Sequence, residues 1–220
     1  MLNSVRFPRY WYDSSSSTLT FQPWLGPIQL SIISIIYEDF VVACRSLLLS
    51  IRDRISIARN QKYEIFEGIC TGSEKVPDLA LRIKPDMRVR QVKFVAKIGF
   101  SETYEELVQD AKLWLKGKKT VSLVMLIKLE EDPYYLCPMQ NFTESEFEQE
   151  FPPMNEIEDQ LFTLSGPYGP AVYKGFVWVG KISVSFEFWA LDPVTRLASC
   201  ITTRMVSNSL RNIRYPSLHM

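Results

Sequence analysis

Acidic and basic residues occur in this chain at the spacing that a metal site on neighbouring strands requires. Asp78 heads one alternating segment, Pro77 to Ile83, and Lys97 lies near the end of the next, Val92 to Ile98. Adjacent strands lie about 5 Å apart, so groups at their ends can meet around one ion. Mg²⁺ and Mn²⁺ are bound by carboxylate oxygens, and cleavage of a phosphodiester also needs a cation for the developing charge. The pattern therefore predicts metal-dependent phosphodiester chemistry.

Two further carboxylates, Glu64 and Glu67, lie on the preceding segment, Lys62 to Cys70, which reads as a short strand ending near Gly68. We expect Asp78, helped by Glu64 or Glu67, to hold the metal, with Lys93 or Lys97 stabilising the transition state. The same spacing fits plainer roles, in which Asp78 only begins a strand and both glutamates are solvated.

Lys97 has three readings that the sequence leaves open. It can contact a phosphate, it can be a catalytic lysine in a migrated site, or it can be a surface lysine on an inactive fold. Either of the last two lysines of its segment, Lys93 and Lys97, can supply the cation.

A helix after these strands has the clearest pattern in the chain. Its apolar stripe recurs at three- and four-residue steps, as Tyr104, Leu107, Val108, Ala111, Trp114 and Leu115. Thr103 and Glu106 fit a capping box at its start, and Gly117 is a natural stop. The run Thr120 to Leu129 is nearly all apolar, which is typical of a central strand covered on both faces.

The rest of the chain is predicted in coarser terms. Residues 1–22 are expected to be poorly ordered, and residues 28 to about 58 follow a helical pattern. Residues 172–191 read as strand, turn and strand, and 196–220 form a tail without assignment. We expect a single α/β domain over residues 23–195, because its length suits one core.

Charge is balanced overall, with 25 Lys and Arg against 25 Asp and Glu, but it is segregated along the chain. A basic stretch precedes the helix and is a candidate surface for DNA phosphates. Its members are Arg82, Lys84, Arg88, Arg90, Lys93 and Lys97. An ordinary solvated sheet edge explains the same residues equally well.

An acidic segment follows, and residues 130–170 read as a loop excursion. Residues 130–159 hold ten acids and no Lys or Arg, with several prolines. This segment can bind a protein partner, or it can cover the basic stretch by mimicking nucleic acid.

Cysteine use and hydropathy predict an intracellular protein, nuclear or cytoplasmic. The four cysteines are widely spaced and the only histidine is His219, so clustered zinc ligands are not expected. Free thiols suit a reducing compartment. No apolar run has the length or composition of a signal peptide or a membrane span, so no membrane partner is expected.

The order of helix, three strands, helix and strand resembles the PD-(D/E)XK superfamily, also called restriction-endonuclease-like. The chain is more closely similar to fungal proteins of uncharacterised function that carry this fold. The features that match are Pro77-Asp78, Ile98-Gly99-Phe100-Ser101-Glu102, Leu107, Asp110-Ala111, Trp114-Leu115 and Val121 to Leu129. A closing hairpin from Phe176 to Trp189 also matches, and the likeness covers about residues 28–191.

The resemblance implies an αβββαβ core with a mixed sheet flanked by helices, plus a C-terminal β-hairpin. It places the metal-binding aspartate of the family on Asp78. The family's glutamate falls on Lys97 and the usual lysine of the superfamily on Gly99. A second alignment, Gln91-Val92-Lys93, provides a lysine at the right spacing but puts glutamine in place of the acid.

Three functions follow from these features. The first is a Mg²⁺- or Mn²⁺-dependent DNA nuclease with an altered site. The second is a catalytically inactive nuclease-like domain that binds nucleic acid or a protein partner. The third is an interaction domain that works through its acidic segment. Lys97 separates the first from the second, because an ammonium repels a divalent ion.

Overall fold

The structure is a computed structural model, and it describes residues 9–22, 27–64, 66–85, 89–134, 140–151, 156, 159–166 and 169–206. The chain divides into two compact units, which are described separately. The first consists of the residues up to Lys128 together with Phe186–Arg204, and the second is built mainly on Leu129–Ser185.

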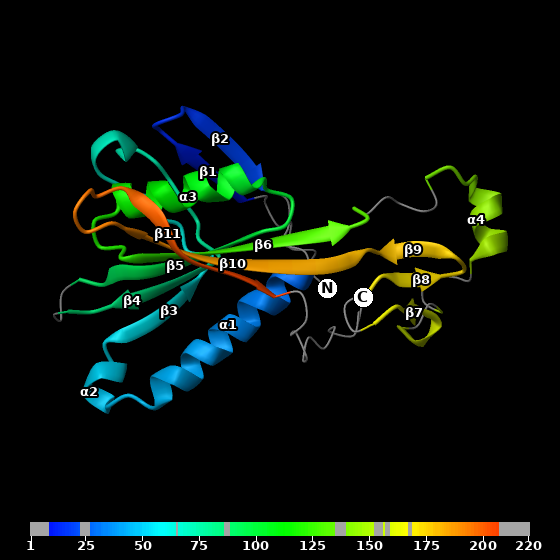
Figure 1. Cartoon of the computed structure of the whole chain (residues 1–220), viewed down its shortest axis with the longest axis horizontal. Coiled ribbons are helices and arrows are strands. Elements are labelled where there is room, and N and C mark those ends of the chain that lie inside the picture. The colour runs from blue at the N-terminus through cyan, green and yellow to red at the C-terminus, as the bar shows by residue number, and fades with distance from the viewer. Residues whose placement is uncertain are drawn as a thin grey trace, which may run out of the picture. The chain divides into compact units, whose positions relative to one another are not determined.

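A mixed six-stranded sheet organises the first unit, in the strand order β11-β10-β6-β5-β4-β3 (Figure 1). The bounds are β3 Ile55–Arg59, β4 Leu79–Ile83, β5 Gln91–Gly99, β6 Leu123–Asp132, β10 Lys181–Leu191 and β11 Ala198–Val206. Strands β3, β4 and β5 pair antiparallel as a meander, and β5 pairs parallel with β6. A helix, α3 (Tyr104–Gly117), makes the connection that a parallel pair requires. The predicted α/β class with a mixed sheet is confirmed.

Two helices cover opposite faces of this sheet (Figure 1). On one face, α1 (Pro27–Arg45) packs against buried side chains that include Leu79, Phe94 and Ala96. On the other, α3 packs its stripe against a cluster that includes Ala80 and Val95. Since Leu79 and Ala80 are neighbours on β4, the two clusters lie on the two faces of one strand.

The predicted capping box of α3 is confirmed. The Thr103 hydroxyl accepts from the backbone N–H of Glu106 at 3.3 Å, and the Glu106 carboxylate accepts from the N–H of Thr103 at 2.7 Å. Both bonds satisfy donors that the start of a helix leaves without partners. The cap fixes where α3 begins, immediately after the loop that carries Glu102.

The predicted long helix and first strand are wrong. Helix α1 ends at Arg45, a short α2 (Leu49–Arg52) follows, and β3 begins at Ile55. Ile55 lies four residues after Ile51 and so continues the helical spacing, which made the start of the strand look helical. Among its described residues, the segment from Lys62 to Cys70 forms a bridge from Tyr63 to Lys75 and a 3₁₀ turn, η1 (Gly68–Cys70), but no longer strand.

The segment Val92 to Ile98 does not keep a regular alternation in the structure. A register shift between Leu81 and Arg82 sets Phe94 opposite Leu81 and Val92 opposite Arg82. Val92 consequently joins the cluster beneath α3, whereas Phe94 and Ala96 face α1. The extra residue at this irregularity is Lys93, which interrupts the alternation of β5.

The N-terminal part, expected to be poorly ordered, contains a hairpin over residues 9–22. Strands β1 (Arg9–Asp13) and β2 (Thr18–Gln22) pair antiparallel around the serine-rich turn. Ser17 has a φ of 52° in that turn. Tyr12 also exchanges backbone hydrogen bonds with Glu74, so the hairpin is anchored to the chain just before β4.

The second unit contains structure where a loop excursion was predicted. It holds α4 (Glu144–Glu150), η3 (Asp159–Leu161) and a small sheet ordered β7-β8-β9. The strands are β7 Thr163–Leu164, β8 Ala171–Tyr173 and β9 Phe176–Val179. Phe151 lies within about 6 Å of the rings of Phe142, Tyr173, Phe176 and Trp178. This aromatic cluster gives the acidic segment an apolar centre.

Candidate functional site: a buried charge cluster

Asp78 lies just before β4 with none of its surface exposed. Its Oδ2 accepts a hydrogen bond from the backbone N–H of Ile98 at 2.8 Å. The pairing of β4 with β5 ends at Leu79 and Ala96, so the Asp78 side chain extends the connection two residues further along β5. From the other side, Gln29 Nε2 donates to the Ile98 carbonyl at 3.3 Å. Asp78 therefore joins the end of β5 to the head of β4.

Lys97 lies beside Ile98 on β5 and is 1% exposed. Its Nζ is 3.1 Å from Oε1 of Glu102. Burial by itself lowers the pKa of this ammonium, but the negative charges of Asp78, Glu102 and Asp110 outweigh it and raise the pKa above 10.5. The lysine is thus a charged, enclosed cation. Its reading as a surface lysine is wrong, because α3 covers the face of β5 that carries it.

Glu102 reaches Lys97 from the loop between β5 and α3. Lys128 on β6 holds that loop, because its Nζ donates to the carbonyls of Phe100 at 3.0 Å and Glu102 at 2.8 Å. Burial raises the pKa of the Glu102 carboxyl, and Lys97 offsets part of that rise. Within the described part of the chain, Oε2 of Glu102 is buried with no hydrogen-bond partner.

A second buried ion pair joins Lys75 to Asp110. Lys75 Nζ and Asp110 Oδ1 are 2.5 Å apart, and their side chains are 5% and 12% exposed. Asp110 belongs to the apolar stripe of α3 and also acts on the charge of Lys97. We call these five residues, Lys75, Asp78, Lys97, Glu102 and Asp110, the buried charge cluster. It contains three carboxyl groups and two ammonium groups.

The predicted metal ligands Glu64 and Glu67 do not join Asp78. Glu64 pairs with Lys62 at 3.2 Å and Glu67 with Lys119 at 2.5 Å, and both carboxylates are largely exposed. They lie outside the sheet, since β3 and not their segment pairs with β4. Among the residues that the structure describes, no three His, Cys, Asp or Glu side chains are placed to hold a metal ion.

Lys93 is also remote from Asp78. It lies at the irregularity of β5, four residues before Lys97, which is roughly 13 Å along a strand. The alternative alignment that begins at Gln91 fails for the same reason, because Gln91 pairs with Ile83 at the far end of β4 from Asp78.

Gly99, on which the superfamily's lysine falls, has no room for a side chain. A Cβ at this position would lie 2.7 Å from a methyl carbon of Leu107. The close approach of β5 to α3 therefore requires glycine here.

Of the predicted phosphate-binding residues, Lys97 is enclosed and is therefore not part of an exposed basic surface. Arg90 is exposed, and Arg82, Lys84 and Lys93 are half-buried. Arg88 lies outside the described residues. Arg82 is held by the side-chain oxygen of Gln61 at 2.5 Å.

Sequence reasoning missed Lys75 and Asp110 as members of the cluster. A signal for Asp110 was present, because it occupies the same helical face as Leu107, Ala111 and Trp114. A carboxylate in an apolar stripe requires a buried partner. Nothing in the local pattern identified Lys75 as that partner.

Two other expectations are tested in part. Of the described thiols, Cys70 is buried, Cys44 is half-buried and Cys200 is exposed. No helix in the described ranges is long and apolar enough to cross a membrane.

No family model, curated protein or solved structure gives a significant match to the chain.

Proposed function

We propose that this chain is a catalytically inactive, nuclease-like domain that acts by binding a partner. The order of α1, β3, β4, β5, α3 and β6 supports the nuclease-like fold. So does the pairing, in which an antiparallel meander is followed by a parallel strand after a helix. Asp78 stands at the head of the second strand of this core and Lys97 near the end of the third.

One observation carries the inactive reading, which is that the Lys97 ammonium is buried among Asp78 and Glu102. It stands where the resemblance expects a metal-ligating acid. Two unit charges 4 Å apart interact by about 4 kcal/mol at an effective dielectric constant of 20, and a divalent ion doubles that repulsion. Lys97 thereby supplies the positive charge that balances Asp78 and opposes any metal beside it.

Two further features support this reading. Asp78 is engaged in holding Ile98, and Gly99 leaves no space for the lysine of the superfamily. The residues that would complete a metal site, Glu64 and Glu67, are solvated elsewhere. The buried charge cluster contributes to the structure of the domain. The proposed function, binding a partner, is then performed by the surface of the domain.

A plasmid-nicking assay in Mg²⁺ and in Mn²⁺ tests this proposal, with Asp78→Asn purified in parallel and folding checked by circular dichroism. We expect the same background for both proteins, and no shift of the melting temperature in either ion. Metal-dependent nicking by the natural chain that Asp78→Asn abolishes would overturn the proposal. Nicking that both proteins share would identify a contaminant.

A further inference from the structure

Strand β3 forms one edge of the six-stranded sheet. The backbone N–H of Lys84 donates to the carbonyl of Arg54 at 2.8 Å, which fixes the alternation of this antiparallel pair. Arg54, Ser56 and Ala58 therefore direct their backbone groups toward β4. Ile55, Ile57 and Arg59 direct theirs outward, and no other strand in the described ranges pairs with them. Such an edge is a template for another strand.

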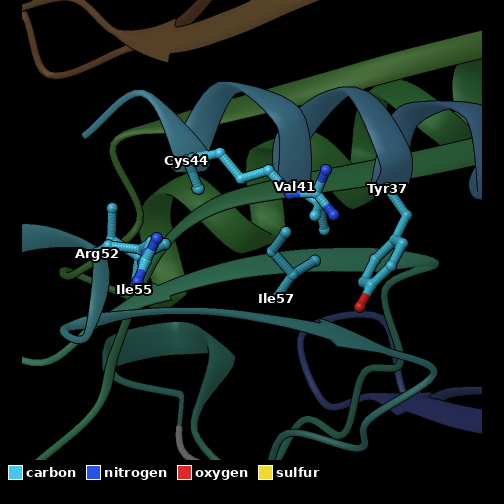
Figure 2. A pocket seen from close by; sticks show the side chains of 7 residues that line it. Tyr37, Val41, Cys44, Arg52, Ile55 and Ile57 are labelled. Atoms are coloured by element: carbon cyan, nitrogen blue, oxygen red, sulfur yellow. The ribbon is translucent and has the colours of Figure 1, made fainter. Parts of the chain in front are cut away.

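A groove runs beside this edge, between β3, α1 and α2 (Figure 2). It encloses a cavity of about 360 Å³. Tyr37, Val41 and Cys44 extend from α1 toward the strand that carries Ile55 and Ile57. The walls are thus mainly apolar. They lie on the face of β3 toward which every second side chain of an added strand would point.

The mouth of the groove is positively charged. Arg45 at the end of α1 and Arg52 on α2 both line it. Residues 45–59 contain four arginines and one acid, Asp53, which gives a net charge of +3. Arg59, at the end of β3, lies over the ring of Tyr37 at 4.5 Å. The charge is complementary to carboxylates on a ligand.

Exposed apolar side chains also lie near the end of α1, in the turn that follows and on α2. Val42, Leu48 and Leu49 are 62%, 73% and 64% exposed, and Ile51 is 47% exposed. Large apolar groups concentrated in one exposed region indicate an interaction surface. They adjoin the arginines, so an occupant meets apolar and positive groups together.

We infer that the edge of β3 and this groove bind an extended acidic peptide of a partner protein. The peptide adds a strand to β3 through the outward N–H and C=O groups of Ile55, Ile57 and Arg59. Its alternate side chains are apolar and enter the groove, because side chains on one face of a strand repeat every second residue. Flanking carboxylates meet Arg45 and Arg52. This inference rests on the binding role proposed above.

Two other occupants fit less well. A second copy joined edge to edge would bring the arginines of residues 45–59 against their own equivalents, which is repulsive. An apolar carboxylic acid would satisfy the arginines and the groove but would leave the outward backbone groups of β3 in water. The peptide alone matches all three features of the surface.

Fluorescence anisotropy of the full chain with a designed probe tests the inference. The probe is a labelled seven-residue peptide with glutamate at both ends and valine at alternate inner positions, separated by threonine. One control peptide carries lysine in place of glutamate, and another has N-methylated backbone amides. We expect the glutamate peptide to bind at least tenfold more tightly than either control.

A charge-reversed variant assigns the binding to the groove. Arg45→Glu/Arg52→Glu should weaken the glutamate peptide at least tenfold. The matched control Lys112→Glu/Lys116→Glu, which changes the charge equally on exposed positions of α3, should leave affinity unchanged. Hydrogen exchange gives a second readout, since the amides of Ile55, Ile57 and Arg59 should slow when the peptide binds, with smaller changes at Ser56 and Ala58.

Each contrary result overturns the inference. Equal binding of all three peptides, no binding by folded protein, or no effect of Arg45→Glu/Arg52→Glu would remove the groove as an acidic-peptide site. If light scattering detects a dimer of the natural chain and Arg45→Glu/Arg52→Glu dissociates it, the surface binds a second copy instead. Metal-dependent nicking by a chain that still binds the peptide would sink the inactive-nuclease proposal alone, so the two failures are distinct.

Discussion

The Asp78 carboxylate is hydrogen-bonded to the backbone N–H of Ile98 at 2.8 Å, directly beside the buried ammonium of Lys97. Asp78 thus fixes the backbone of β5 at Ile98 and balances the charge of the preceding residue, Lys97. The resemblance to nucleases predicts a metal site at these two positions, whereas the hydrogen bond from Ile98 to Asp78 joins two strands there. The predictions below separate those two roles.

Asp78→Asn should lower the free energy of unfolding by about 3–5 kcal/mol. The amide oxygen can still accept from Ile98, but the substitution removes a negative charge that compensates Lys97. Urea unfolding followed by circular dichroism measures the loss. Glu64→Gln is the matched control on an exposed carboxylate, and it should change stability by less than about 0.5 kcal/mol. Equal stability of Asp78→Asn and the natural chain would contradict the ion-pair role.

Lys97→Met should also destabilise the domain, since it leaves Asp78 and Glu102 buried without their cation. The double variant Asp78→Asn/Lys97→Met should lose less than the sum of the single losses, with a coupling of about 1–3 kcal/mol. A double-mutant cycle in urea gives that coupling. Strict additivity would mean that the two charges do not act on one another.

Stability should fall with rising pH in two separate windows. The folded state holds a proton on Glu102 more tightly than the unfolded chain does, because burial raises the pKa of that carboxyl. Its contribution is therefore lost as pH rises from about 4.5 through the folded pKa. The Lys97 pKa is raised because nearby carboxylates outweigh the effect of burial, so its contribution is present below 10.5 and lost above it.

Two variants isolate these windows in urea unfolding at a series of pH values. Glu102→Gln should remove the decline on the acidic side and reduce the alkaline one, because the Glu102 charge also raises the Lys97 pKa. Lys97→Met should remove the alkaline decline. Unchanged pH profiles in both variants would show that other groups control the titration.

Gly99→Ala should destabilise the protein by about 1–3 kcal/mol, because its Cβ would meet Leu107 at 2.7 Å. Gly72→Ala is an instructive comparison, since the added Cβ there would make only an ordinary contact with Ser14 at 3.9 Å but the glycine has a φ of 86°. Trimming the obstacle in Gly99→Ala/Leu107→Ala should cost less than the two single losses combined. A fully stable Gly99→Ala would mean that β5 and α3 can separate, and would reopen this position to a lysine.

The parts of the fold that the sequence predicts well are those with strong local signals. Helix α3 has a regular stripe and a capping box, and β4 alternates cleanly. Strand β3 was missed because Ile51 and Ile55 suit a helical spacing, and only pairing with β4 shows that Ile55 begins a strand. The error moved Glu64 and Glu67 onto a strand that does not exist.

The burial of the Lys97 ammonium could not be predicted from the local sequence, for a different reason. Lys93, Val95 and Lys97 alternate as though one face of β5 were solvated. Tertiary packing places α3 over that face, and the charge is kept by carboxylates from the head of β4, the following loop and α3. Sequence order separates these groups by 5 to 19 residues, and only the folded topology brings them to one point.

The buried ammonium has a consequence for how the domain depends on its surroundings. A metal ion must be recruited from solution, and its occupancy varies with supply and with chelators. Lys97 arrives with the polypeptide in a fixed one-to-one ratio, so its local concentration is set by chain connectivity. The domain should accordingly unfold at the same temperature in EDTA as in millimolar Mg²⁺, because the stability of its core does not depend on the supply of metal ions.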